Sequence, residues 1–202
     1  MMNIIIIDGR DSERYLSGIA EVHYGAYSKE HFTSCFDRDL LERYYKYLVQ
    51  KSDLSIVAVE GEVVVGFIVA GYSVGSGVSQ FVKDNRASVI KVFLKNPRFI
   101  YEKTLSIVTA KLAKGRVSAP VAPVAPFRLM SISVRSGIQS RGVGSALLHF
   151  FENNLLASNI AEYGLSVRKK NDRAIKFYIR SGFAVQKETR DSLYFYKELK
   201  ND

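Results

Sequence analysis

The spacing of apolar residues divides the chain into strands and helices. Two-residue alternation and short continuous apolar runs predict strands at residues 3–8, 55–60, 63–72, 127–134, 163–167, 183–187 and 193–199. Helices are expected at about 11–24 and 39–51, after the glycines of 142–144, and from Asn171 onward. A hairpin turn is expected at 60–62, and the last two strands are expected to form an antiparallel pair. The pattern predicts a mixed α/β protein.

A long segment separates the third predicted strand from the fourth. Residues 71–77 contain three glycines and predict a flexible stop after the third strand. Helices are expected at about 79–94 and 98–114, with a break at Asn96 and Pro97. A stiff polyproline II connector is predicted by the three-residue spacing of Pro120, Pro123 and Pro126. We therefore expect a single domain over 1–202, with a helical insertion at about 73–126.

The composition is that of a soluble globular protein. Apolar residues make up 47% of the 202 residues, and the mean hydropathy is close to zero. The longest apolar run, at 63–70, is far shorter than a membrane span, and the first residues lack the features of a signal peptide. The single cysteine, Cys35, excludes an internal disulfide. We expect a cytoplasmic protein without a transmembrane segment.

The net charge of +9 is unevenly distributed along the chain. Residues 83–116 contain nine basic and two acidic side chains, which accounts for seven of the nine excess charges. A solvated helical face is the ordinary explanation of such a segment, and it contains no established nucleic-acid-binding motif. We therefore expect no nucleic acid as a partner, and a basic surface that attracts an anionic substrate.

The segment 134–146 is the clearest candidate for chemistry. It follows a predicted strand, contains Gly142 and Gly144, and leads into a helix, so unpaired N–H groups at the helix start can bind a phosphate. A P-loop would need a lysine where Ser145 stands. A dinucleotide-binding loop would need a third glycine where Leu147 stands, and an acidic residue at the end of the next strand, which instead ends in Arg168.

Two segments together carry a family resemblance. The motif Gln139-x-x-Gly142-x-Gly144 resembles the acyl-CoA pyrophosphate loop of the GNAT superfamily of N-acetyltransferases. Residues 165–183 are similar to the second signature of that family, with a strand, Asn171, Ala174, a Phe-Tyr pair and a terminal Gly-Phe. Their local chemistry agrees, since Asn171 is a good N-cap and Ala174, Phe177 and Tyr178 share one helix face.

The resemblance implies a GNAT-like, mostly antiparallel mixed sheet of about seven strands flanked by helices. Family members usually join the third and fourth strands by a tight turn, so the insertion at 73–126 is the main departure. Acetyl-CoA is implied as the co-substrate, and no metal is needed. The implied cofactor-binding residues are Ser133, Val134, Gln139, Ser140, Arg141, Gly142, Val143, Gly144, Ser145, Asn171, Ala174 and Phe177.

The resemblance also implies a catalytic role for Tyr178. Many family members place a tyrosine beside the cofactor sulfur, and a phenol, with a pKa of about 10 in model peptides, can protonate a leaving thiolate. We expect Phe177 to pack in the core, which leaves Tyr178 for the cleft. Some members carry a Glu base early on the fourth strand, where this chain has Arg128. Candidate bases elsewhere are a water chain or His31, Asp37, Glu60, Glu62 and Tyr72.

These observations predict an enzyme that transfers an acetyl group from acetyl-CoA to a primary amine. The basic insertion favours a small, anionic acceptor such as a nucleotide-linked amino sugar. Acetylation of a protein N-terminus or lysine is an alternative activity, and an inactive CoA-binding module is an alternative of another class. The sequence is also compatible with a homodimer.

Overall fold

The computed structural model describes residues 2–7, 12–26, 32–96, 125–139 and 141–200. Its elements in chain order are β1 (Met2–Ile7), α1 (Glu13–Ala26), the 3₁₀ turn η1 (Phe32–Cys35), α2 (Arg38–Gln50), β2 (Leu54–Glu60), β3 (Val63–Gly71), α3 (Val74–Asp84), α4 (Arg86–Lys95), β4 (Arg128–Val134), α6 (Val143–Ala157), β5 (Glu162–Arg168), α7 (Asp172–Arg180), β6 (Ala184–Glu188) and β7 (Ser192–Glu198). The helix expected at 98–114 and the first two prolines of the expected connector lie outside the described residues.

The strands form one mixed sheet in the order β1-β2-β3-β4-β5-β7-β6. All neighbouring strands pair in antiparallel fashion except β4 and β5, which are parallel. The predicted fold class, a mostly antiparallel sheet of about seven strands flanked by helices, is therefore confirmed. Every predicted strand is present, with ends within two residues of those expected.

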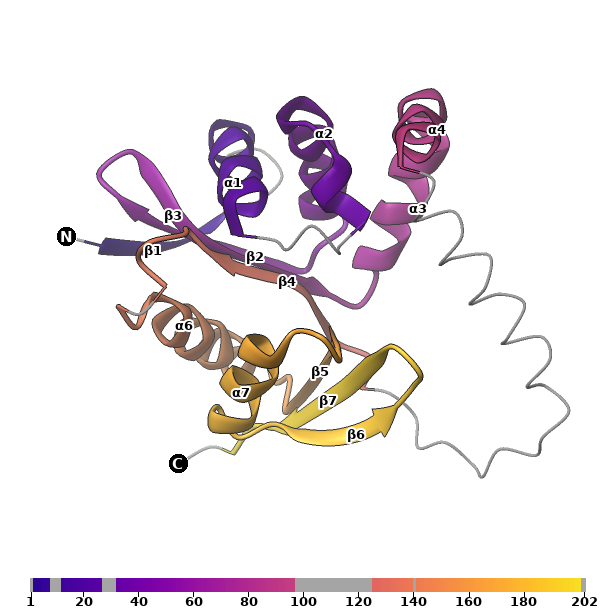
Figure 1. The fold of residues 1–202 in the computed structure, drawn as a ribbon. Coiled ribbons are helices and arrows are strands. Elements are labelled where there is room, and N and C mark those ends of the chain that lie inside the picture. Colours follow the sequence, from indigo (N-terminus) through magenta and orange to yellow (C-terminus); the bar gives the residue numbers. More distant parts are fainter. Residues whose placement is uncertain (1, 8–11, 27–31, 97–124, 140, 201–202) are drawn as a thin grey trace, which may run out of the picture.

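Helices cover both faces of this sheet. Helices α1 and α2 lie on one face, and α6 and α7 lie on the other (Figure 1). Alternate residues of β2 pack into the hydrophobic cores on the two faces of the sheet. Ile56 and Ala58 pack toward α6, and Val57 and Val59 pack toward α1 and α2. This two-sided burial explains why β2 and β3 appear in the sequence as almost continuous apolar runs.

The insertion differs from the sequence prediction. The stretch 71–77 was expected to be a flexible stop, but α3 begins inside it at Val74 and continues to Asp84. Gly77 is buried in this helix because α3 crosses α2 closely: a Cβ added there would lie 2.6 Å from the carbonyl oxygen of Tyr47. A second helix, α4, follows after Asn85, so the expected single helix at 79–94 is divided in two. The glycine serves packing and not flexibility.

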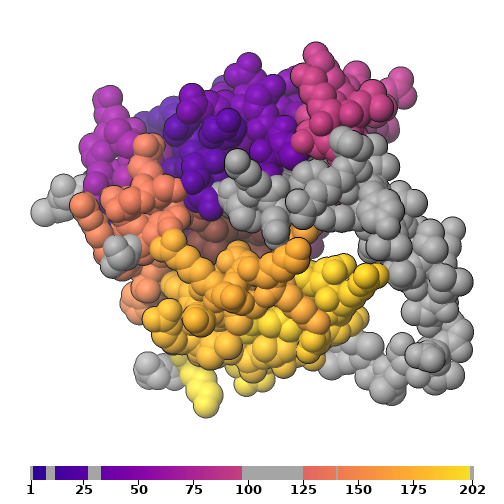
Figure 2. Space-filling model, viewed as in Figure 1, coloured from indigo at the N-terminus to yellow at the C-terminus, as the bar shows by residue number. Residues whose placement is uncertain are grey.

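Strands β4 and β5 separate soon after they meet. Arg128 and Gly164 form the only described pair between them. Helix α6 follows the end of β4, and helix α7 follows the end of β5. The ends of β4 and β5 and the starts of α6 and α7 therefore meet at the gap. In the space-filling view, the α1–α2 layer and the α7–β6–β7 part lie on opposite sides of the recessed strands (Figure 2).

Candidate functional site

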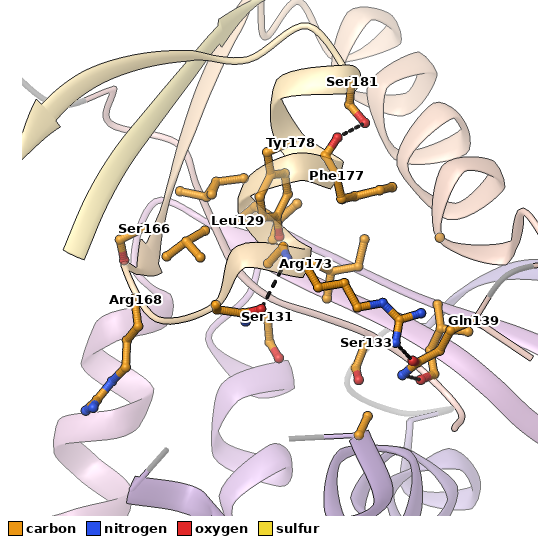
Figure 3. Close-up of a pocket in the computed structure, with 18 of the residues that line it drawn as sticks. Leu129, Ser131, Ser133, Gln139, Ser166, Arg168, Arg173, Phe177, Tyr178 and Ser181 are labelled. Atoms are coloured by element: carbon orange, nitrogen blue, oxygen red, sulfur yellow. Dashed lines mark hydrogen bonds between the residues drawn. The ribbon is translucent and has the colours of Figure 1, made fainter. Parts of the chain in front are cut away.

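A cleft of about 1230 Å³ lies where β4 and β5 part. Its walls come from β4, β5, the start of α6 and one face of α7. The structure brings together at this cleft most of the residues predicted from sequence: Ser133, Val134, Gln139, Gly142, Gly144, Ser145, Asn171, Ala174, Phe177 and Tyr178. Figure 3 shows several of them around one hollow.

The backbone of β4 presents hydrogen-bonding groups to this gap. The N–H of Arg135 donates to the carbonyl of Val65 across 2.8 Å, and Val134 lies opposite Gly66. Bonded and non-bonded pairs alternate in an antiparallel ladder, so Val134 occupies a non-bonded position relative to β3. Its N–H and C=O therefore point away from β3, toward the side where β5 has diverged.

Helix α6 starts with an N-terminus suited to an anion. Its N-cap, Gly142, has a φ of 77°, in the left-handed region that favours glycine. The carbonyl of Gly142 accepts from the N–H of Ala146, which closes the first turn. The N–H groups of Val143, Gly144 and Ser145 belong to the part of a helix that lacks intrahelical acceptors, at the positive end of its dipole.

Gln139 connects the end of β4 to helix α7. Its amide nitrogen donates to the carbonyl of Val134 over 3.0 Å, and its amide oxygen accepts from the guanidinium of Arg173 (Figure 3). Both amide ends of the side chain are thereby used within the protein. Gln139 holds the glycine loop and α7 in a fixed relation across the cleft.

Helix α7 carries the second group of predicted residues. The side chain of Asn171 accepts a 3.1 Å hydrogen bond from the N–H of Ala174, which confirms it as the N-cap. Burial of the Phe-Tyr pair is the reverse of our expectation. Phe177 is partly buried, whereas Tyr178 is only 5% exposed and packs against the rings of Phe183 and Phe195 at centroid distances of 5.2 and 5.9 Å. Both residues line the cleft.

The charge of the cleft comes from side chains that the motif did not identify. The basic residues along its wall are Arg168, Lys170, Arg173 and Arg180, and all four are solvent-exposed. No Asp or Glu is found among the described lining residues. The run of basic residues directly after β5 was the available signal in the sequence. An anionic ligand is the natural occupant of a cleft with this charge.

Three predicted cofactor-binding residues are not among the described residues that line the cleft. Ser140 lies outside the described residues. Arg141 is exposed and is not among the described lining residues, and the side chain of Val143 is 3% exposed within the hydrophobic core. Any contact of Val143 with a ligand therefore falls to its backbone. The roles of all three remain predictions.

The described base candidates lie away from the cleft lining. Asp37 accepts from the N–H of Leu40 over 2.8 Å as the N-cap of α2, and Glu60 and Glu62 are exposed at the β2–β3 turn. Tyr72 is 55% exposed and contacts the ring of Phe127. His31 lies outside the described residues. Arg128, where some GNAT enzymes have a glutamate, is partly buried over the ring of Tyr194, and this burial lowers its pKa.

Comparison with known proteins agrees with this site. Residues 120–183, which contain β4, the glycine loop, α6, β5 and α7, match the model of the acetyltransferase (GNAT) family. The resemblance to the GNAT family is confirmed. The match covers the described cleft wall from β4 to α7. A search of curated protein sequences gave no significant match.

Solved structures share the fold over nearly the whole chain. The crystal structure of PH1933 from Pyrococcus horikoshii OT3 is similar at a TM-score of 0.64 and 20% identity, with 100% of both chains covered. The PaiA N-acetyltransferase from Thermoplasma acidophilum, solved in complex with coenzyme A, matches at 0.53 and 15%, with 98% and 99% covered. The ribosomal-protein-S18-alanine N-acetyltransferase from Escherichia coli matches at 0.53 and 15%, with 100% and 96% covered. At these identities the likeness concerns the GNAT fold.

The described part of the chain also shows two absences. None of its helices is both long and apolar enough to cross a membrane. Within the same residues, no three side chains of His, Cys, Asp or Glu gather in a way that could hold a metal ion.

Proposed function

We propose that this protein is an acetyl-CoA-dependent N-acetyltransferase that acts on a primary amine of a small molecule. One observation carries the proposal: both GNAT signatures converge on a single cleft, at the point where β4 and β5 part. The family match and the coenzyme A complex of a structural neighbour support the same conclusion.

The residues of the cleft fit coenzyme A chemically. Gly142 and Gly144 remove side chains from the start of α6, where backbone N–H groups can bind a diphosphate. The exposed Arg173 and Lys170 add positive charge on the same cleft wall. On β4, the outward-facing N–H and C=O of Ile132 and the N–H of Val134 can pair with the pantetheine arm.

Bound acetyl-CoA would supply a thioester whose acetyl group passes to the acceptor amine. In this arrangement the N–H of Val134 polarises the thioester carbonyl, because it points into the gap from a fixed position on β4. Tyr178 holds a proton at its phenol oxygen and gives it to the departing sulfur, and the proton that the acceptor nitrogen loses as the amide forms restores the phenol. The rings of Phe183 and Phe195 fix the orientation of Tyr178 and exclude water from its side of the cleft.

The acceptor is proposed to be small and anionic, such as a nucleotide-linked amino sugar. The described cleft lining has basic residues and no carboxylate, so a basic peptide would meet like charges there. Acetylation of a protein N-terminus remains the second candidate, since the S18-alanine N-acetyltransferase of Escherichia coli has the same fold. A cytoplasmic location and a homodimer are proposed on the sequence alone.

Free thiol release tests the proposal. The protein is incubated with acetyl-CoA and a panel of amines that includes nucleotide amino sugars, polyamines and short peptides, and acetylated products are identified by mass spectrometry. We expect CoA release above the rate without amine and a mass increase of one acetyl group on an anionic small molecule. Acetylated peptides alone would favour the second candidate. Coenzyme A binding without any release would identify an inactive binding module.

A further inference from the structure

Helix α1 is connected to the wall of the cleft by a continuous series of buried hydrogen bonds. The hydroxyl of Thr33 lies 2.8 Å from Nε2 of His23, and Nδ1 of His23 lies 2.6 Å from the hydroxyl of Tyr45. The Tyr45 hydroxyl is in turn 3.0 Å from Oγ of Ser131. Ser131 belongs to β4 and lines the cleft. The path thus joins an imidazole to the surface of the proposed active site.

All four side chains in this series of hydrogen bonds are buried. Thr33 is 4% exposed, His23 is 2%, Tyr45 is 0% and Ser131 is 6%. The ring of Tyr45 is packed edge-on against Phe67 and Tyr44, with centroids 5.0 and 5.4 Å away. Polar groups buried in an apolar layer cost stability unless they are hydrogen-bonded, and a satisfied network fixes the orientation of each member.

The hydrogen bonds between Ser131, Tyr45 and His23 can all run in one direction, from the cleft toward the imidazole. When Nε2 of a neutral His23 carries the hydrogen, Nδ1 accepts from the hydroxyl of Tyr45, and the Tyr45 oxygen then accepts from the hydroxyl of Ser131. In this state each hydroxyl proton points from the cleft toward the imidazole. The Ser131 oxygen can then accept a proton on its cleft side as it gives its own away.

We propose that Ser131, Tyr45 and His23 form a proton relay that removes the proton from the acceptor ammonium. The proposal rests on the N-acetyltransferase function proposed above. Ser131 is the group that meets the substrate, while Tyr45 and His23 act through it. Ser131 and Ser133 leave β4 on the same side, away from Tyr178 (Figure 3). The base path and the proposed acid therefore approach the reacting atoms from different sides.

The proton movements in this relay balance. The N–H bond of the ammonium breaks as its proton binds to the Ser131 oxygen, the Ser131 proton moves to the Tyr45 oxygen, and the Tyr45 proton moves to Nδ1 of His23. The acceptor is left as a neutral amine with a free electron pair, both hydroxyls are restored, and His23 becomes an imidazolium. After the products leave, the same steps in reverse return the proton to water.

The relay supplies a general base, which the described lining of the cleft does not offer as a carboxylate. No carboxylate occurs among the described lining residues, and Asp37, the acidic candidate nearest in sequence to Thr33, is used in capping α2. A neutral imidazole is well suited to general base catalysis near neutral pH. Its placement behind two hydroxyls also keeps a positive charge away from a cleft that is already basic.

Kinetics of three variants test the relay. With the best amine of the panel, Ser131→Ala and Tyr45→Phe should each lower kcat by about 100-fold, the scale of a general base, while the affinity for acetyl-CoA in calorimetry stays unchanged. Ser131→Thr keeps the hydroxyl and should recover most of the activity. Rates in H₂O–D₂O mixtures should show several protons in flight for the wild type and fewer for Tyr45→Phe.

Tyr163→Phe is the matched control. Tyr163 is also fully buried, but its hydroxyl donates to Glu152 over 2.6 Å and takes no part in the relay. Burial, followed by the nearby Glu152 carboxylate, raises the pKa of Tyr163, so it stays a donor. This variant should lose stability comparably to Tyr45→Phe and keep its kcat. Equal loss of kcat in both variants would assign the effect to folding and overturn the relay.

A resting-state measurement is independent of turnover. The sequence has three histidines, so the ¹⁵N signals of the His23 ring can be assigned by substitution. Both Tyr45→Phe and Ser131→Ala should shift the Nδ1 signal of His23, and a signal unmoved by Ser131→Ala would overturn the chain of hydrogen bonds.

The two proposals fail in different ways. Full kcat in Ser131→Ala with an active wild type would overturn the relay and leave the acetyltransferase standing. A folded wild type that releases no CoA with any amine would overturn both.

Discussion

At the scale of single residues, Gly142 and Gly144 differ in backbone conformation, because only Gly142 has a φ in the left-handed region. A Cβ at Gly142 has open space around it, but its φ of 77° is strained for other residues. At Gly144 a Cβ would sit in ordinary contact with Phe177 and Val134, at 3.7 Å. Gly142→Ala should therefore lower the free energy of unfolding by about 1 kcal/mol and weaken coenzyme A binding.

Gly144→Ala is the control for the stability part of this prediction, with a nearly unchanged free energy of unfolding, because its Cβ would make only ordinary contacts. Thermal denaturation and titration calorimetry measure the two effects. If both variants bound coenzyme A like the wild type, the left-handed N-cap would have no part in the site.

Tyr178 is the second residue whose role can be isolated. Removal of its hydroxyl in Tyr178→Phe leaves the packing against Phe183 and Phe195 in place, since the ring is retained. We expect kcat to fall about 100-fold, the scale of a lost general acid, with little change in the Kd for acetyl-CoA. Steady-state kinetics and calorimetry give both numbers. Unchanged turnover would remove Tyr178 from the mechanism.

At the scale of elements, two helix caps of the same kind differ in their distance from the cleft. Asn171 caps α7 and lines the cleft, whereas Asp37 caps α2 and does not. Asn171→Ala and Asp37→Ala should each cost about 1 kcal/mol of folding stability. Only Asn171→Ala should also weaken binding of coenzyme A. Chemical denaturation and calorimetry distinguish a structural cap from one that also contacts the ligand.

The elements that the sequence predicted well are those with a strong local signal. The strand, glycine loop and helix around Gly142 and the cap at Asn171 follow from periodicity and end chemistry. The start of α3 was missed because Gly77, read as a flexible position, is required by the close crossing of α2, which is a long-range contact. The burial of Tyr178 was likewise set by Phe183 and Phe195, on the following loop and on β7.

The residues of the proposed relay likewise could not be predicted from sequence patterns, because long-range packing brings them together. His23, Tyr45 and Ser131 are separated by 22 and 86 positions in the chain. No motif joins them, and only the packing of α1 and α2 on the sheet brings their polar atoms together. Sequence patterns predicted the residues of the proposed cofactor side of the cleft, and tertiary structure was needed to propose those of the acceptor side.

At the scale of the whole molecule, we expect charge to contribute to the binding of coenzyme A. The chain carries a net charge of +9, and exposed basic residues line the cleft. Added salt shortens the screening length from about 10 Å at 0.1 M to about 3 Å at 1 M, so the Kd for coenzyme A should rise with ionic strength. Dephospho-CoA, which has one phosphate fewer, should show a shallower dependence in the same titrations. Equal slopes would exclude a role for the basic wall in binding that phosphate.

The gap between β4 and β5, with the start of α6, is the proposed binding site of coenzyme A, and this is the central claim. Titration calorimetry of the folded protein with coenzyme A tests it directly. We predict saturable binding of one molecule per chain, weakened by Gly142→Ala. The absence of binding heat from folded protein across the temperature range of the native state would contradict the claim.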